Sequence, residues 1–558
     1  MMEKTGRMRG GVRSIAAVNL VVALLSCVTF AAEAKDTSAN KGVTSEIVRL
    51  LDSGFSVGSG AEHIRPALRT YYKKQGGALL WVGSGRMTVL IRRLTRAEED
   101  GLDPSQYPIT TLETRQTSVV KGDTRSLAET ELVFSTAFLT YASDLKVGRL
   151  SPRKIDPELF AQTKTIDGVA VLAKLGDYED LNVFFRLWAP HNPEYRALRV
   201  LLSVHREIAA RGGWPTVPSG ETLKPGMRSP RVARVRARLK ASGDITVDSA
   251  KPDVYDPALV MAVKRFQRRH GLEADGVVGP QTVAVMNIPV EERVKQIVVN
   301  MERWRWLPEN LGDRYILVNI AGFKLHLVDA GAVQDRMRVA VGKPYRRTPV
   351  FSDHIRYLEF NPYWTVPYSI ATRDLLPKIK KNPGILKVKG YEVFRDGKSV
   401  TPETINWSSL SGKNFPYTLR QKPGPKNALG RVKFMFPNKF AVYLHDTPGR
   451  HVFGRASRAF SSGCIRLARP IDLAEEVLRD TPDWNRERID AVLETGKRTV
   501  VNLKKRLPVH LTYSTAWSGE GGTINFRPDI YGRDKSLHDA LFPQKAALGT
   551  STTAAAQP

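Results

Sequence analysis

The sequence contains very little cysteine: two residues in 558, Cys27 and Cys464. Two cysteines cannot supply a disulfide framework or a cysteine-rich zinc module. Histidine is also scarce, with 10 residues scattered along the chain in no ligand-like spacing. The sequence therefore predicts a protein that binds no metal and needs no other cofactor.

Acidic residues are the second shortage. The chain has 56 Asp and Glu against 85 Lys and Arg, so its formal net charge is +29 and its pI is near 10.0. Such a charge favours anionic surroundings, whether nucleic acid, anionic lipid or an acidic polymer. The apolar fraction of 42% and the charged fraction of 25% are those of a folded protein. At roughly 150 residues per domain, the length indicates three or four domains.

The first 34 residues have the layout of an export signal. Basic residues precede an apolar run over 15–30, and Ala32-Glu33-Ala34 follows as a small-x-small cleavage site. Cleavage after Ala34 is the first interpretation. An uncleaved membrane anchor is the second, because the uncharged stretch is long enough to span a bilayer, and lipidation of Cys27 is the third. All three export the chain, which excludes cytoplasmic nucleic acid as a partner and leaves inner-membrane contact only to an uncleaved segment.

Cys464 is the one cysteine outside that segment. A lone thiol outside the cytosol has no intramolecular disulfide partner. It is therefore either buried and inert or reactive for a purpose, and its neighbours in the sequence decide between the two.

Residues 42–221 are predicted to form a helical scaffold. Apolar residues recur at helical spacing, most clearly over 127–145, where Ser126 and Glu129 are predicted to form a capping box. This part of the chain contains no cluster of titratable residues suited to catalysis. At the other end of the chain, residues 544–558 are rich in Ala and Thr and are predicted to be a disordered tail.

Residues 222–288 have a different pattern. Seven Lys or Arg and no acid lie within 224–240, and an amphipathic helix and a Gly- and Pro-rich loop follow. The distinctive residues are Phe266-Gln267, His270-Gly271-Leu272, Asp275-Gly276 and Gly279-Pro280 followed by Thr282. This combination closely resembles the peptidoglycan-binding domain of cell-wall enzymes, which implies a three-helix wall-anchoring module. The basic stretch suits an anionic wall polymer, and a contribution to solubility explains it equally well.

Strand patterns begin at residue 314. Runs at 315–320, 323–328 and 336–341 predict strands joined by tight turns, and further strands are predicted at 432–436 and 441–445. Residues 365–420 are less regular and look like an insertion. A helix is predicted over 470–478, with proline at its first position.

His445 ends one of these strands, and Cys464 follows 19 residues later, within Ser461-Ser462-Gly463-Cys464-Ile465-Arg466. A cysteine attacks a carbonyl as its thiolate, and a nearby imidazole can take the proton. The amide N–H groups around Gly463 and Cys464 are candidates for an oxyanion hole. Arg466 is expected to lower the thiol pKa and could hold a substrate carboxylate. The alternative is a buried cysteine with an unrelated histidine on the sheet.

The residues from His445 to Arg466 resemble the active-site motif of the L,D-transpeptidase catalytic domain, which has the YkuD-type fold. Further matches to the large multidomain branch of that family are Asn361 to Trp364, Val366-Pro367, Asn427 to Gly430, Lys433-Phe434, Phe436 to Asn438, Tyr443 to Pro448, Gly101 to Pro104 and Asp529 to Arg533. One departure is Ser462, where many shorter members carry histidine, so that His445 is the only nearby candidate base.

The resemblance implies a multidomain α+β architecture. It comprises a helical scaffold over 42–221, a three-helix peptidoglycan-binding module over 222–288, and a mostly β YkuD-type catalytic domain over 314–537. The insertion at about 365–420 corresponds to a capping subdomain, which would cover the acyl-enzyme and exclude water.

The resemblance also implies peptidoglycan L,D-transpeptidation in the periplasm. Cys464 would attack a tetrapeptide stem, release D-Ala and pass the acyl group to a side-chain amine in a 3→3 cross-link, with His445 as base and then acid. The predicted oxyanion or substrate-binding residues are Gly463, Ser462, Arg466, Trp364, Tyr443 and Asn438. Trp364 and Tyr443 are also reasonable core aromatics, and Asn438 is a reasonable turn residue.

Other outcomes of the same chemistry stay open. The thioester could pass to an amine of an outer-membrane protein, or to water in an L,D-carboxypeptidase. From a different class, the chain could be a wall-binding structural protein without catalysis, whereas a papain-like peptidase is disfavoured by the wall-binding module. The expected partners are peptidoglycan stem peptides and glycan, with outer-membrane proteins as further acceptors.

Overall fold

The computed structural model describes residues 37–56, 62–74, 79–119, 123–162 and 164–543, with side chains from residue 40 onward. The predicted export signal over 1–34 and the predicted tail over 544–558 lie outside these residues. In the part of the chain that is described, no helix combines the length and the apolar character needed to cross a membrane.

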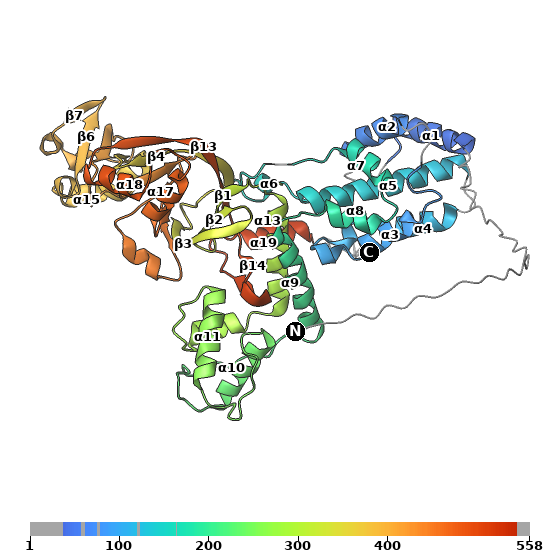
Figure 1. The fold of residues 1–558 in the computed structure, drawn as a ribbon, viewed down its shortest axis with the longest axis horizontal. Helices are drawn as coiled ribbons and strands as arrows, with labels where there is room; N and C mark the ends of the chain where they lie inside the picture. The colour runs from blue at the N-terminus through green and yellow to red at the C-terminus, as the bar shows by residue number, and fades with distance from the viewer. Residues whose placement is uncertain (1–36, 57–61, 75–78, 120–122, 163, 544–558) are drawn as a thin grey trace, which may run out of the picture.

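The N-terminal part is helical, as predicted (Figure 1). Its helices are α1 (Thr37–Asp52), α2 (Arg65–Lys74), α3 (Arg86–Thr95), α4 (Ile109–Ser118), α5 (Thr124–Val147), α6 (Pro152–Ile155), α7 (Gly168–Gly176) and α8 (Leu181–Trp188). Helix α5 is the centre of this bundle, because the aromatic face formed by Phe134, Phe138 and Tyr141 is fully buried. The predicted capping box is wrong: the Asp123 carboxylate caps α5 by accepting from the Ser126 N–H at 2.8 Å.

Two long helices join the scaffold to the rest of the molecule. They are α9 (Pro193–Ala210) and α13 (Val290–Arg305), which Figure 1 places between the scaffold bundle and the sheet. Leu198 and Leu202 of α9 and Ile297 and Met301 of α13 are buried in the same apolar core as the strands of the catalytic domain. Helix α9, which lies within the predicted scaffold range, therefore packs as part of the catalytic core.

The predicted peptidoglycan-binding module contains helices α10 (Pro230–Ala241), α11 (Pro257–His270) and α12 (Pro280–Met286) around a small apolar core of its own. Most of the basic stretch at 224–240 holds this module together. Arg236 pairs with Asp256 at 2.9 Å, and the buried Arg238 donates to the Met286 carbonyl at 2.7 Å and lies 4.0 Å from the Trp214 ring centroid. Arg236 and Arg238 are therefore engaged within the protein and are not available to a wall polymer.

The predicted catalytic domain is built on one large sheet of strand order β11-β3-β12-β10-β9-β4-β13-β1-β2, which closes on itself through a further β3–β2 pairing. Its strands are β1 (Arg314–Asn319), β2 (Lys324–Asp329), β3 (Ala332–Gly342), β4 (Phe351–Phe360), β9 (Val432–Met435), β10 (Leu444–His445), β11 (Ala459–Ser461), β12 (Ile465–Leu467) and β13 (Thr499–Thr512). A hairpin follows, β14 (Ala516–Ser518) and β15 (Ile524–Phe526), and the domain also contains helices α17 (Pro470–Leu478), α18 (Arg486–Glu494) and α19 (Arg533–Leu541). This mostly β domain confirms the predicted fold class.

The strand predicted at 441–445 is shorter in the structure, where only Leu444 and His445 pair as β10. Ala441 has a φ of 52°, a left-handed conformation that does not continue a strand. The Asn438 side chain holds the preceding turn, accepting from the Phe440 N–H at 3.0 Å and donating to the Val442 carbonyl at 2.8 Å. A loop therefore leads directly into the predicted active-site strand.

Residues 364–421 form a cap with its own sheet, of strand order β5-β8-β6-β7. Its elements are β5 (Trp364–Thr365), α14 (Tyr368–Ile370), a π-helical turn (Ala371–Leu375), α15 (Leu376–Lys381), α16 (Ile385–Val388), β6 (Tyr391–Arg395), β7 (Lys398–Val400) and β8 (Tyr417–Gln421). Leu376, Ile379 and Leu419 lie in an apolar cluster separate from that of the main sheet. Figure 1 places this cap at the opposite end of the molecule from the scaffold helices.

Candidate active site

The parallel pairing of β10 with β12 brings the predicted base and nucleophile to one face of the sheet. Leu444 lies opposite Ile465 and His445 opposite Arg466. Because alternate residues of a strand point to the same face, His445 and Arg466 share one face with Tyr443 and Cys464. Leu444 and Ile465 point to the other face and are completely buried in the core. The His445 and Tyr443 rings confirm the shared face, with centroids 5.7 Å apart.

The Cys464 side chain is half-buried and faces a short loop and a tyrosine. Its sulfur lies 3.7 Å from the Ala441 carbonyl oxygen, and the backbone N–H and hydroxyl of Tyr443 also approach it. Burial raises the pKa of the Cys464 thiol above its ordinary value, and the Tyr443 donors and the charges of Lys433 and Arg466 only partly oppose this. The charge of Arg466 lowers the thiol pKa, as predicted, but burial outweighs it.

His445 is buried and oriented by a backbone carbonyl. Its Nδ1 lies 2.5 Å from the Asp446 carbonyl oxygen, so that Nδ1 carries the proton and Nε2 is left as the basic nitrogen. Burial, and then the charge of Arg466, lowers the pKa of His445 to about 3. The imidazole is therefore neutral at ordinary pH and able to accept a proton. Among the described residues, no hydrogen bond joins it to the Cys464 sulfur in this resting arrangement.

The Ser461 hydroxyl holds two peptide groups of the turn that leads into Cys464. Gly463 has a φ of 117°, which favours glycine. The Ser461 hydroxyl accepts from the Gly463 N–H at 3.1 Å and donates to the Cys464 carbonyl at 2.6 Å. The Gly463 N–H is therefore occupied, which corrects its prediction as an oxyanion donor. The Cys464 N–H has no acceptor among the described residues and stays the candidate.

Ser462 links the turn to the cap through an arginine. Its hydroxyl accepts from Arg346 Nη1 at 3.0 Å, and the same guanidinium pairs with Asp374 of the π-helical turn, with Nη2 2.9 Å from Oδ1. This pair lowers the pKa of the Asp374 carboxyl, chiefly through the hydrogen bond from Arg346. Ser462 is thus placed to connect the catalytic turn with the cap.

Arg466 is the cation without a partner in this site. In the described part of the chain its guanidinium makes no ion pair, and its Nε is buried without an acceptor. Lys433, in contrast, lies 3.5 Å from the Glu359 carboxylate and 4.6 Å from the Tyr443 ring centroid. An unpaired guanidinium beside the thiol is the arrangement that suits an incoming carboxylate.

The remaining predicted residues lie at the edges of the site. Trp364 begins the cap and packs against the cap core, with its ring centroid 6.3 Å from that of Tyr391. Asn438 organises the loop that carries the Ala441 carbonyl toward the sulfur. A direct role for either residue in binding substrate stays a prediction.

Sequence reasoning missed three contributors: the Ala441 and Asp446 carbonyls and the hydroxyl of Thr348. A backbone carbonyl has no side-chain signal in a sequence. Thr348 lies far from Cys464 along the chain, so only the folded structure brings it to the turn.

Comparisons with known proteins identify domains in this chain. A family model described as "L,D-transpeptidase catalytic domain" matches residues 313–500, one described as "Putative peptidoglycan binding domain" matches 228–286, and one described as "Scaffold domain" matches 66–202. The chain therefore combines a YkuD-type L,D-transpeptidase catalytic domain with a peptidoglycan-binding domain. This result confirms the resemblance predicted from the sequence motifs.

Individual relatives point to the same family. A Haemophilus influenzae protein named "Putative L,D-transpeptidase" is 38% identical over 245 residues, which are 44% of this chain and 49% of that protein. The match thus spans about half the length of this relative.

Two solved structures resemble the chain only distantly. An L,D-transpeptidase from Xylanimonas cellulosilytica is 16% identical, covers 53% of this chain and 98% of its own, and has a TM-score of 0.18. An L,D-transpeptidase from Mycobacterium smegmatis is 14% identical, covers 36% of this chain and 58% of its own, and has a TM-score of 0.17. TM-scores this low add nothing to the fold and site described above.

Proposed function

We propose that this protein is a peptidoglycan L,D-transpeptidase of the periplasm that forms 3→3 cross-links through a Cys464 thioester. The observation that carries the proposal is the shared face of β10 and β12, where a half-buried thiol, a neutral imidazole and an unpaired guanidinium lie together. The peptidoglycan-binding module on the same chain supports a wall polymer as the substrate.

The first half-reaction forms the thioester. The Cys464 side chain rotates away from the Ala441 carbonyl, and its proton passes to Nε2 of His445 as the sulfur attacks the third-residue carbonyl of a tetrapeptide stem. The C–N bond to the terminal D-Ala breaks, and the imidazolium returns the proton to the departing amine. Because the Asp446 carbonyl accepts from Nδ1, it stabilises the charged imidazolium during this step.

The second half-reaction resolves the thioester. A side-chain amine of a neighbouring stem attacks the carbonyl, the C–S bond breaks, and the proton from the amine passes through His445 to the sulfur. The Cys464 N–H is the donor proposed for the oxyanion in both steps. The cap tied to Ser462 through Arg346 would limit access of water, which would otherwise release a tripeptide.

Arg466 is proposed to bind the terminal carboxylate of the donor stem. Arg466 is half-buried and its Nε is buried without an acceptor, which is costly unless one arrives, and a planar guanidinium matches a carboxylate with two parallel hydrogen bonds. Export through the N-terminal segment would place the enzyme beside its polymer, and outer-membrane proteins with accessible amines are a second class of acceptor.

The experiment is incubation of the full chain with purified disaccharide-tetrapeptide muropeptides, with products identified by mass spectrometry. We expect free D-Ala and a tetrapeptide–tripeptide dimer from the wild type and neither from Cys464→Ala. Tripeptide monomers alone would replace transpeptidation by carboxypeptidase activity. Unchanged muropeptides, together with no mass gain after carbapenem treatment, would leave a wall-binding structural protein.

A further inference from the structure

A threonine in the loop between β3 and β4 holds the catalytic turn. Thr348 is completely buried, and its hydroxyl donates to the Gly463 carbonyl at 2.8 Å while it accepts from the Gly342 N–H at 2.9 Å. Both hydrogen-bonding functions of the hydroxyl are therefore used. The loop that carries Thr348 closes tightly, because a Cβ on Gly342 would lie 2.1 Å from the Arg346 carbonyl oxygen.

The anchored carbonyl determines where the neighbouring N–H points. The peptide bond between Gly463 and Cys464 is planar and trans, so that its C=O and N–H point in opposite directions. Fixing the Gly463 carbonyl on Thr348 therefore fixes the Cys464 N–H on the side away from Thr348. Glycine on one side of this peptide makes rotation of the plane easy, so that an anchor is needed to hold one orientation.

Thr348 is itself held by a tyrosine. Its backbone N–H donates to the Tyr531 hydroxyl at 3.1 Å, and this hydroxyl donates to the Gly342 carbonyl at 2.7 Å. Tyr531 is buried, and its own N–H donates to the Tyr513 hydroxyl at 2.9 Å. A chain of hydrogen bonds thus runs from the C-terminal segment to the catalytic turn.

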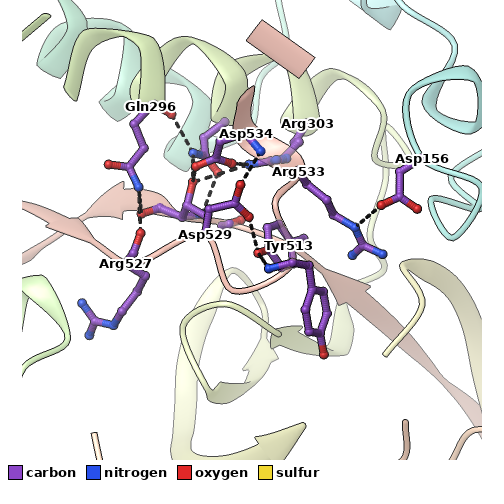
Figure 2. A network of polar contacts seen from close by, with 12 residues as sticks. Asp156, Gln296, Arg303, Tyr513, Arg527, Asp529, Arg533 and Asp534 are labelled. Carbon is purple, nitrogen blue, oxygen red and sulfur yellow. Dashed lines mark hydrogen bonds and ion pairs between the residues drawn. The ribbon is translucent and has the colours of Figure 1, made fainter. Parts of the chain in front are cut away.

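Tyr531 lies between Asp529 and Arg533, and Figure 2 shows the contacts that fix these two residues. On one side, Asp529 accepts from the Tyr513 hydroxyl at 2.5 Å and from the Asp534 N–H at 2.6 Å. On the other side, Arg533 donates to Asp156, in the segment that leaves the scaffold, at 2.8 Å. Tyr531 is therefore part of a rigid, buried polar network, which suits a residue that keeps Thr348 in a fixed position.

We infer that Thr348 is a positioning residue for the transpeptidase reaction: by binding the Gly463 carbonyl it aims the Cys464 N–H at the oxyanion, and Tyr531 supports it. This inference rests on the proposed function, because it assigns the alignment of one donor in that site. The inference predicts that loss of Thr348 slows only those reactions of Cys464 that pass through an oxyanion, because the Cys464 N–H donor acts only there.

The test compares two reactions of the same sulfur in the full-length chain. Acylation by a carbapenem passes through an oxyanion, whereas alkylation by iodoacetamide needs the thiolate and no oxyanion. Thr348→Val should lower the acylation rate constant by about 100-fold, the scale for losing one aligned oxyanion donor. The alkylation rate constant and its pH profile should stay within about twofold of wild type, and Thr348→Ser should restore acylation.

Thr512→Val is the matched control. Thr512 is likewise a buried threonine, although it lies in β13, and its hydroxyl donates to the Val318 carbonyl at 3.0 Å. The Thr512→Val variant therefore loses the same kind of hydrogen bond away from the turn. We expect its acylation and alkylation rate constants to match those of wild type. Equal losses of acylation in the Thr348 and Thr512 variants would overturn the inference.

Further outcomes separate this inference from the proposed function. A wild type that no carbapenem and no stem peptide acylates would remove the proposed function. A wild type that is acylated, with Thr348→Val equally fast or slowed equally in alkylation, would remove the inference alone. If Thr348→Val does not fold, Tyr531→Phe takes its place: we expect about tenfold slower acylation with unchanged alkylation, and unchanged acylation would contradict the inference.

Discussion

At the scale of single residues, the site combines two groups whose uncharged forms are favoured. Burial raises the pKa of Cys464 and lowers the pKa of His445 to about 3, so that the resting pair is a neutral thiol and a neutral imidazole. A preformed thiolate–imidazolium pair would require the opposite shifts. The sulfur therefore becomes nucleophilic only when its proton moves to His445 during attack.

The first prediction concerns the pH dependence of acylation. Because the pKa of His445 is about 3, the imidazole is neutral at both pH 7.5 and pH 5. The rate constant for carbapenem acylation should therefore change by no more than about twofold between these pH values. Stopped-flow measurement at each pH checks this. A base with an ordinary histidine pKa would lose roughly 30-fold over the same range, and such a fall would contradict the proposed resting state.

The second prediction concerns the unpaired guanidinium. Arg466→Met should raise the KM for a stem-peptide donor by about 10- to 100-fold, because a charge-assisted contact with the donor carboxylate is lost. The control is a donor whose terminal carboxylate is replaced by a carboxamide. Wild type should discriminate against this donor and the variant should not, so that equal discrimination by both proteins rules out the assigned role.

At the scale of elements, short loops position the site between well-formed strands. The loop before β10 brings the Ala441 carbonyl to the sulfur, and the loop before β9 meets Asp446 beside the histidine. Asp446 holds that second loop, since its carboxylate accepts from the Arg431 N–H at 2.9 Å. Gly430 lies in this loop against the Asp446 side chain, so that the alignment of the neighbouring His445 depends on this glycine.

The third prediction is a pair of glycine substitutions. A Cβ on Gly430 would lie 2.3 Å from the Asp446 carboxyl carbon, whereas nothing lies within 4 Å of a Cβ on Gly496. Both glycines have a φ of 61°, so that alanine brings the same backbone strain to each. Gly430→Ala should lower the acylation rate constant by at least about tenfold. Gly496→Ala should leave it near wild type while losing about 1 kcal/mol of stability. Equal rate constants would show that the Asp446 contact is unimportant.

Much of the element pattern could be predicted from the sequence. The helix at 470–478 and the strands near 315–320 and 323–328 lie where periodicity and turn residues put them, within a residue or two. The start of α5 was missed because Glu129 pairs with Arg115 and Arg125 and does not return to its own helix end. A sequence pattern indicates hydrogen bonds to the nearby backbone, whereas the Glu129 carboxylate pairs with two arginine side chains.

The site was predictable in its nucleophile and base and less so in its support. Cys464 and His445 carry chemistry in their side chains and could be recognised from their sequence context. The state of the thiol, the occupied Gly463 N–H and the anchoring hydroxyl of Thr348 depend on contacts between distant segments. Burial and long-range contacts of this kind leave no mark on a sequence.

At the scale of the whole molecule, arginines fasten the modules to the catalytic domain. Arg527, next to the β14–β15 hairpin, donates to the Arg269 carbonyl of the peptidoglycan-binding module at 2.6 Å, and Glu273 of that module accepts from the Ala456 N–H at 2.6 Å. On the scaffold side, Arg533 and Arg347 both donate to Asp156. The wall-binding and catalytic parts are therefore held in a defined relative position.

The fourth prediction is that two buried groups, His326 and Asp144, make opposite contributions to stability in acid. Burial lowers the pKa of His326, in the catalytic domain, to about 4, so that below pH 6.5 the unfolded chain binds a proton that the folded chain does not, and stability falls. Burial raises the pKa of Asp144, in the scaffold, to about 7, so that the folded chain binds the extra proton and stability rises on acidification. Each effect is about 1.4 kcal/mol per pH unit within its window.

Calorimetric Tm values at pH 7 and pH 5 check these signs. On acidification, His326→Gln should lose less Tm than wild type, and Asp144→Asn should lose more. The exposed His354 provides the control, and His354→Gln should follow wild type. The account of burial fails if the His326 and Asp144 variants shift in the same direction.

The most direct test of the central claim is the intact mass of the protein during turnover. Wild type is mixed with a tetrapeptide donor, quenched in acid within seconds, and digested to locate any adduct. We predict a mass gain equal to the donor minus D-Ala on the peptide that contains Cys464, formed at least about 100-fold more slowly in His445→Ala. Release of D-Ala with no adduct on Cys464, or an adduct on another residue, would contradict the claim.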